Sequence, residues 1–223
     1  MEYEIIRSSR KTLALTIDKD GKLIVRAPCR FPESRIEEFI KEKSDWIEKH
    51  SAAASKRSEQ RNERLSLPPK ELPLWGKLSP VSHKKPYGYI DGVVHLPENM
   101  SLEALLPYLR KLYAAIAKET LIPRTYAAAE RMGFEITAVR INSAKTRWGS
   151  CSAQRSINLS RMLIAADPKL IDYVIVHELC HTVHMDHSPA FWKLVERYIP
   201  DFRERREALK DVQKVLSEYG LDQ

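Results

Sequence analysis

The sequence from Val176 to His187 reads VHELCHTVHMDH, which contains the pattern HExxH and a further histidine six residues later. Residues four positions apart lie on the same face of an α-helix, one turn from each other. His177 and His181 can therefore direct their imidazoles at one metal ion, whereas Glu178 can reach a water molecule on the open side of that ion. This pattern and spacing are typical of zinc-dependent hydrolases.

Signals before the motif predict that it lies on a helix. Asp167 is a capping residue, and Pro168 suits the first helical position. Apolar residues then recur with helical spacing at Leu170, Ile171, Val174, Ile175 and Leu179. A solvated helix with a histidine-rich end is the alternative interpretation, but it does not account for these flanking residues.

The third histidine ligand is either His184 or His187. On a continuous helix His184 would lie about 10.5 Å along the axis from His177, too far for two zinc–nitrogen bonds of about 2.0–2.1 Å to one ion. His187 is the better candidate if the chain leaves the helix near His184 and turns back. Asp186 tolerates a left-handed turn conformation, and Ser188-Pro189 is typical of the start of a new helix. We expect His184 to lie at the rim of the site or to support a ligand.

Several runs of sequence resemble one protein family. These runs are Tyr173 to His181, His184 to Ser188, Phe191-Trp192, the upstream RWGSCS at 147–152, and LWGK at 74–77. Together they resemble the YgjP-like metallopeptidases, which are relatives of the WLM and SprT-like zinc proteases. The resemblance extends over most of the chain, and about residues 51–69 lie outside it.

The resemblance implies an α+β protein with a zincin-like core, in which the HExxH helix packs on a small mixed sheet. It implies Zn2+ as the cofactor, with His177, His181 and His187 as its ligands. Glu178 is implied as the catalytic carboxylate, acting as general base and acid on a zinc-bound water. The implied substrate is a peptide or protein. Nucleotide pyrophosphohydrolase activity has also been attributed to the family, so a nucleoside triphosphate is the alternative substrate.

Two features beside the motif could contact a substrate. Arg147 could bind a substrate carbonyl or phosphate, because its guanidinium is planar and stays charged, or it could form a surface salt bridge. The strand expected at 157–160 could present an edge to an extended peptide, or it could only pack the sheet against the metal helix.

The charge and composition of the chain limit which other functions we expect. The formal net charge is +7, but basic and acidic residues alternate, as in KRSEQRNER at 56–64 and RERRE at 203–207. Such mixing suits solvated helix faces, so we do not expect a dedicated nucleic-acid surface. A non-catalytic nucleic-acid-binding module is the third alternative to the two hydrolases.

The cysteines and the amino terminus bear on location. Cys29, Cys151 and Cys180 are odd in number and widely separated, which favours a reducing compartment over a disulfide framework. We expect structural roles for Cys180 and for Cys151, although Cys151 could approach the site. The chain starts with MEYE, has no signal-peptide core and contains no apolar run of roughly 18–20 residues. We expect a cytoplasmic protein that does not enter a membrane.

The chain is expected to have two parts. Residues 1–97 form an amino-terminal β-rich module with a hairpin turning at 18–21, one helix opened by Pro32 and short strands between 72 and 96. A charged connection at about 51–69 is either mobile or an extension of that helix. Residues 98–223 form the catalytic core.

The catalytic core is expected to begin with helices. Ser101 caps an amphipathic helix, and a second helix runs from Pro123 to about Arg131 and ends at Gly133. Strands at 136–141 and 157–164 then flank a turn at 147–150 and lead to the metal helix.

Overall fold

The computed structural model describes residues 2–222, and the chain divides into two compact units between Glu63 and Arg64. Both units combine helices with small sheets, which confirms the α+β class. The division lies before the boundary expected at residue 97, because the strands between 71 and 95 pack into the core of the C-terminal unit through Leu72, Leu74 and Val94. No helix among the described residues is long and apolar enough to cross a membrane.

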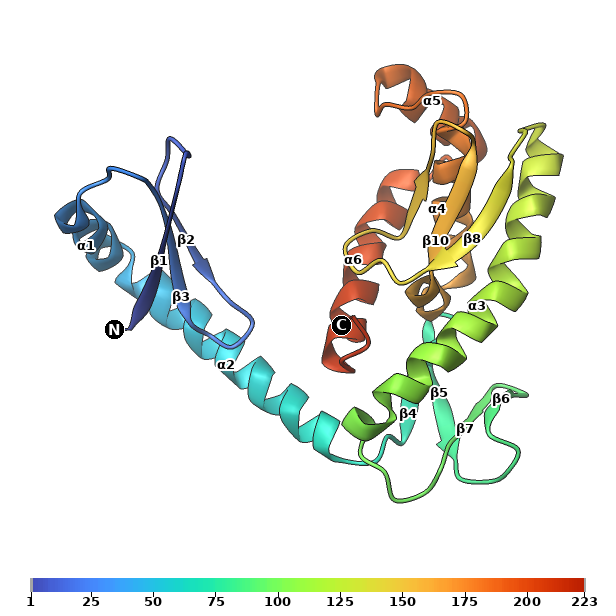
Figure 1. The fold of residues 1–223 in the computed structure, drawn as a ribbon, viewed down its shortest axis with the longest axis horizontal. Helices are drawn as coiled ribbons and strands as arrows, with labels where there is room; N and C mark the ends of the chain where they lie inside the picture. The colour runs from blue at the N-terminus through green and yellow to red at the C-terminus, as the bar shows by residue number, and fades with distance from the viewer. Residues whose placement is uncertain (1, 223) are drawn as a thin grey trace. The chain divides into compact units, whose positions relative to one another are not determined.

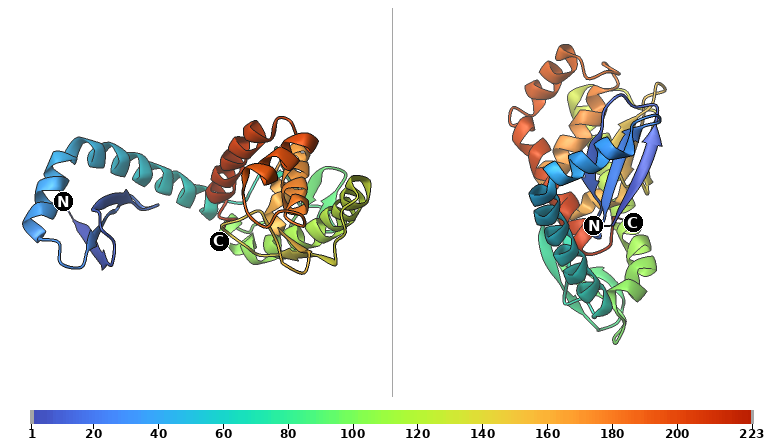
Figure 2. Two further views of the ribbon diagram at one scale, coloured as in Figure 1. Left: turned by 90° about the horizontal axis from the view of Figure 1, so that it is seen from above. Right: turned by 90° about the vertical axis from the view of Figure 1, so that its left-hand side faces the viewer.

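The described part of the N-terminal unit has one three-stranded sheet and two helices, which can be followed in Figures 1 and 2. Its strands are β1 (Tyr3–Ser8), β2 (Ala14–Ile17) and β3 (Leu23–Pro28), in the order β1-β3-β2. β3 is parallel to β1 and antiparallel to β2, and the expected hairpin between β2 and β3 is confirmed.

The helices of this unit share one small core with β3. α1 (Glu33–Glu42) and α2 (Ser44–Ser66) contribute Ile36 and Ile47 to it. The single helix expected after Pro32 is therefore interrupted at Lys43. The charged connection at about 51–69 was expected to be either mobile or helical. Residues 51–66 belong to α2, so most of this connection is helical.

The C-terminal unit begins with a four-stranded sheet. Its strands are β4 (Glu71–Leu74), β5 (Lys77–Ser82), β6 (Gly88–Ile90) and β7 (Val93–His95), in the order β4-β5-β7-β6. A turn at Asp91-Gly92 joins β6 to β7, and both of its residues have positive φ. Glycine and aspartate tolerate this conformation better than most residues.

A single long helix follows, α3 (Leu102–Met132). Ser101 caps its start by accepting a hydrogen bond from the amide of Ala104, and Gly133 ends it in a left-handed conformation. The separate helix expected from Pro123 was wrong, because α3 continues through this proline. The loss of one backbone hydrogen bond costs roughly 3 kcal/mol, and the buried face on either side, with Leu121 and Ala128, offsets it.

The second sheet of this unit is mixed and has three strands. β8 (Ala138–Asn142) is parallel to the central strand β10 (Ser156–Ser160), and β9 (Gly149–Cys151) is antiparallel to it. The turn expected at 147–150 thus leads into an edge strand. The strand expected to reach Ile164 ends at Ser160, whose hydroxyl accepts a hydrogen bond from Met162 and starts the 3-10 helix η1 (Arg161–Ala165).

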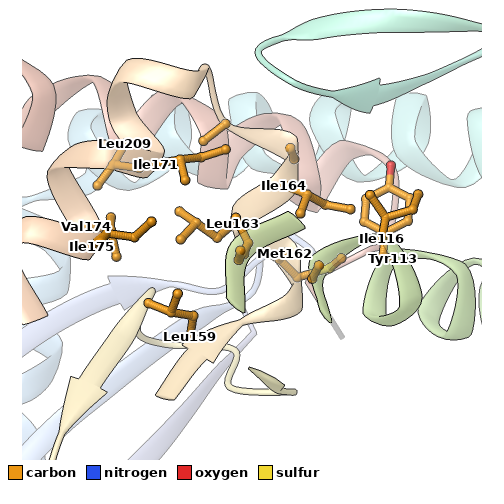
Figure 3. Packing of buried hydrophobic residues seen from close by; sticks show 14 of the residues in the cluster. Tyr113, Ile116, Leu159, Met162, Leu163, Ile164, Ile171, Val174, Ile175 and Leu209 are labelled. Atoms are coloured by element: carbon orange, nitrogen blue, oxygen red, sulfur yellow. The ribbon is translucent and has the colours of Figure 1, made fainter. Parts of the chain in front are cut away.

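Three helices complete the unit: α4 (Pro168–Cys180), α5 (Pro189–Tyr198) and α6 (Phe202–Glu218). α4 packs on β9 and β10 and contacts α5 and α6 (Figure 1). Figure 3 shows the core between these elements, where Val174 and Ile175 of α4 lie near Leu159 of β10 and Leu209 of α6. The expected packing of the HExxH helix on a small mixed sheet is confirmed.

The turn between β4 and β5 holds the start of α4. The amides of Trp75 and Gly76 donate to the carbonyls of Ile164 and Ala165, over 2.7 and 3.0 Å. Gly76 has φ +75°, and a Cβ there would lie 2.7 Å from the Cα of Asp167, so no other side chain fits. Asp167 caps α4 as expected, by accepting from the amide of Lys169. This close contact sets the position of the helix that bears the motif.

Candidate metal centre

The chain turns back after α4 and brings His187 to the motif. The amides of Val183 and His184 both donate to the carbonyl of Cys180, which ends the helix in a tight turn. Asp186 does not adopt the left-handed conformation that was expected. Its carboxylate instead accepts a hydrogen bond from the amide of Ser188, and Ser188 caps α5 as expected.

Three histidines converge at this turn. The Nε2 atoms of His177 and His187 are 3.2 Å apart, and the possible ligand atoms of His177, His181 and His187 all lie within 4.8 Å of one another. A tetrahedral ion with zinc–nitrogen bonds of about 2.0–2.1 Å needs nitrogens about 3.3–3.4 Å apart. The three side chains therefore fit a single metal ion.

The ring of His181 is oriented by the backbone of the turn. Its Nδ1 donates to the carbonyl of His184 over 2.9 Å, since a carbonyl can only accept, and this leaves Nε2 free as a ligand. His184 thus supports the site through its backbone, and its side chain lies outside the three-histidine group.

Aromatic residues at the start of α5 pack against the histidine rings. Phe191 stacks on His181 with ring centroids 4.4 Å apart, and Trp192 stacks on His187 at 5.4 Å. These contacts restrict the rotation of both imidazoles, so less conformational entropy is lost when a metal binds.

His177 is held as a neutral imidazole. Burial, together with the nearby His181, His187 and Arg206, lowers its pKa to about 3. Its Nδ1 is buried and has no hydrogen-bond partner among residues 2–222. A neutral imidazole with a free Nε2 is the form that binds a metal ion.

The carboxylate of Glu178 lies between α4 and the edge strand β9. Glu178 is only 5% exposed. A Cβ added to Gly149 would lie 2.6 Å from its Cγ and 2.7 Å from its Oε1. Burial raises the pKa of this carboxyl group to about 8, although the charge of Arg147 acts in the opposite direction.

These groups line one cavity of about 1010 Å3. Its walls are the segment 145–151, α4, the turn at Met185 and His187, and the facing sides of α5 and α6. Arg147 lies in this wall, is exposed and has no acidic partner among the described residues, so the alternative of a surface salt bridge is not realised. β10 cannot accept a peptide at an edge because it is paired on both sides; the free edge at the cavity belongs to β9.

Cys180 and Cys151, the two cysteines near the site, are held by packing or by a backbone hydrogen bond. Cys180 is fully buried, as expected for a packing residue. Cys151 lines the cavity from β9, and its thiol donates to the carbonyl of Ser152 at 3.4 Å. Burial, followed by the charge of Glu178, raises the pKa of the Cys151 thiol.

Several residues of the cavity wall were not predicted from the sequence, and three of them interact with Glu178 or His177. Gly149 was quoted only within a family motif, although a glycine in a strand can mark close contact. Tyr173 precedes His177 by one helical turn and therefore shares its face. Arg206 is remote from the motif in sequence, and no local pattern connects it to the site.

With this geometry in place, comparison with known proteins defines the class. The YgjP-like family, described as a metallopeptidase domain, matches residues 11–212. The chain therefore belongs to the YgjP-like family of metal-dependent hydrolases, which confirms the resemblance.

One similar solved structure is the metallopeptidase zymogen of Pyrococcus abyssi, abylysin. It is 24% identical, with 41% of this chain and 90% of that chain covered and a TM-score of 0.35. No curated protein matches the chain.

Proposed function

We propose that this protein is a zinc-dependent peptidase in which His177, His181 and His187 bind the metal and Glu178 is the general base and acid. The observation that carries the proposal is the convergence of three imidazoles beside one buried carboxylate in an open cavity. Three neutral nitrogen ligands suit zinc and leave a fourth position of a tetrahedral ion open. The three free cysteines support a reducing, cytoplasmic location.

The chemistry divides between the metal and the protein. A bound zinc ion would supply a double positive charge that acidifies water and polarises the scissile carbonyl. The charge of a bound zinc ion would lower the raised pKa of Glu178. Its carboxylate can then take a proton from the attacking water and return it to the leaving nitrogen. Its burial between α4 and β9 keeps bulk water away from this proton transfer.

The free edge of β9 provides a place for the substrate backbone. Gly149, Ser150 and Cys151 pair with β10 on one side only, and all three line the cavity on the other. An extended peptide could add there as a further strand through main-chain hydrogen bonds. Because Gly149 lies against Glu178, a scissile carbonyl paired with β9 would lie next to this carboxyl group.

We expect the zinc-loaded protein to cut an unfolded protein substrate into fragments. A reduced, alkylated protein should be incubated with it and the products followed by gel electrophoresis and mass spectrometry. Chelation should stop the cleavage, and added zinc should restore it. Absence of fragments, or fragments that form equally well with chelator, would contradict the proposal.

A nucleoside triphosphate is the second candidate substrate, because basic side chains line the cavity from two sides. A panel of nucleoside triphosphates assayed for released diphosphate tests it. Metal-dependent diphosphate release without any peptide cleavage would replace the peptidase proposal.

A further inference from the structure

The charge in the cavity is unevenly distributed. Lys145 and Arg147 lie in the segment leading to β9, and Arg206 and Lys210 lie on α6. Lys210 forms an ion pair with Glu207 at 2.6 Å, so Arg206 is the unpaired cation that α6 contributes among the described residues. Among residues 2–222, Glu178 is the one acidic residue in the lining, and it is nearly fully buried. The part of the wall that a ligand would meet is therefore positive.

The basic residues of α6 differ in how they are paired. Arg203 forms an ion pair with Glu196 at 2.8 Å, and Arg205 pairs with Asp201 at 2.9 Å. Arg206 lies next to them in sequence, yet it has no acidic partner within residues 2–222. Its guanidinium lies over the ring of Trp192 instead, 5.4 Å from the ring centroid.

Arg206 also lies close to the metal centre. Trp192 stacks on His187, so the guanidinium is one ring away from a proposed ligand. The charge of Arg206 contributes to the low pKa of His177, after burial and the neighbouring histidines. It also lowers the pKa of Tyr173, which burial raises. The charge of Arg147 likewise lowers the pKa of Glu178, which burial raises.

Two unpaired guanidiniums thus flank the reacting groups. A substrate lying along β9 would cover them and remove part of their hydration, which is unfavourable unless the substrate provides a counter-charge. A carboxylate is well suited, because it can accept two parallel hydrogen bonds from one guanidinium. The apolar ring of Trp192 beside Arg206 strengthens such a contact by reducing the local dielectric.

We propose that the cavity selects peptides with an aspartate or glutamate side chain beside the scissile bond, with Arg206 as the main specificity-determining residue and Arg147 as the second. This inference rests on the proposed peptidase function and names its substrate class. The free edge of β9 favours a peptide over other anions, since an extended backbone can pair with it while its side chains reach α6.

Binding can be measured without turnover in the zinc-loaded Glu178→Gln protein. Trp148 and Trp192 line the cavity, so their fluorescence should report binding of a peptide. The probes are two peptides with acetylated and amidated ends that differ only in one central Asp or Asn. Because both ends are blocked, a preference for the first can come only from the side-chain carboxylate.

We expect the Asp peptide to bind about 10- to 100-fold more tightly than the Asn peptide at low salt, as for a hydrogen bond between charged groups. Arg206→Gln should remove most of this preference, and Arg206→Glu should reverse it in favour of a Lys peptide. Arg203→Gln is the matched control, because Arg203 lies three residues earlier on α6 and pairs outside the cavity. It should keep the preference.

The outcomes separate this inference from the proposed function. Zinc-dependent cleavage with equal binding of both peptides, or equal effects of the Arg206 and Arg203 variants, would overturn the selectivity and leave the peptidase intact. Selective binding that depends on Arg206 without any cleavage would support the subsite and contradict the peptidase. Tight binding of a nucleoside triphosphate through Arg206, with no peptide preference and no peptide cleavage, would overturn both.

Discussion

Glu178→Gln is expected to lower the turnover number for peptide hydrolysis by about 10²- to 10⁴-fold, the usual contribution of general acid–base catalysis. The amide has nearly the same shape, so it should fit between α4 and Gly149, but it cannot accept the proton from water. The zinc content should stay at one ion per chain, because Glu178 is not one of the three converging ligands.

The measurement is a comparison of kcat and metal content for the two proteins under identical loading. Metal analysis is the control, since an inactive protein that has lost zinc would say nothing about the carboxylate. Unchanged turnover at full zinc occupancy would contradict the role of Glu178 as base.

Gly149→Ala is expected to reduce kcat by about a hundredfold, the scale of a displacement of about 1 Å in a catalytic group. The new methyl group would overlap the Cγ, Cδ and Oε1 atoms of Glu178, all within 2.8 Å of its position. The backbone of Gly149 does not have the positive φ that would itself strain an alanine. The side chain of Glu178 must therefore move, while the strand can remain in place.

Two controls distinguish displacement of Glu178 from general damage. The urea midpoint should change little, because the atoms that must give way belong to a flexible side chain. In the Glu178→Gln background, Gly149→Ala should have little further effect on kcat, because the two changes act through the same group. Additive losses, or a large drop in the urea midpoint, would contradict this explanation.

The local signals in the sequence predicted the metal helix and the turn after it. Asp167-Pro168 and Ser188-Pro189 start α4 and α5 because a capping side chain and a proline act within one helical turn. The choice of His187 over His184 followed from the rise of a helix and from the turn signals at Asp186 and Ser188-Pro189, and the structure brings His187 to the other two histidines.

Features that depend on tertiary packing were predicted less well. Pro123 was expected to start a helix, but burial of the residues on both sides keeps α3 continuous. β9 has three residues and includes a glycine, so it has no alternating pattern, and only its pairing with β10 identifies it as a strand. The two compact units divide after Glu63, whereas the sequence suggested a division after residue 97, because short strands near residues 71–95 do not reveal in sequence which core they join.

The basic residues that line the cavity also could not be identified from the sequence. Arg206 and Arg203 belong to one mixed-charge helix, and the sequence does not distinguish them. The distinction arises because Arg203 finds Glu196, whereas Arg206 lies over Trp192 at the cavity. Cavity residues that come from a helix remote in sequence can therefore be identified only from the structure.

The most direct test is anomalous diffraction at the zinc edge from crystals of the zinc-loaded protein. We predict one strong peak per chain, about 2.0–2.1 Å from a ring nitrogen of each of His177, His181 and His187, with no fourth protein ligand. His184→Ala should retain this peak, since only its backbone carbonyl is used, and His181→Ala should lose it. A peak elsewhere, or an ion whose fourth position is closed by a further side chain, would contradict a catalytic metal centre.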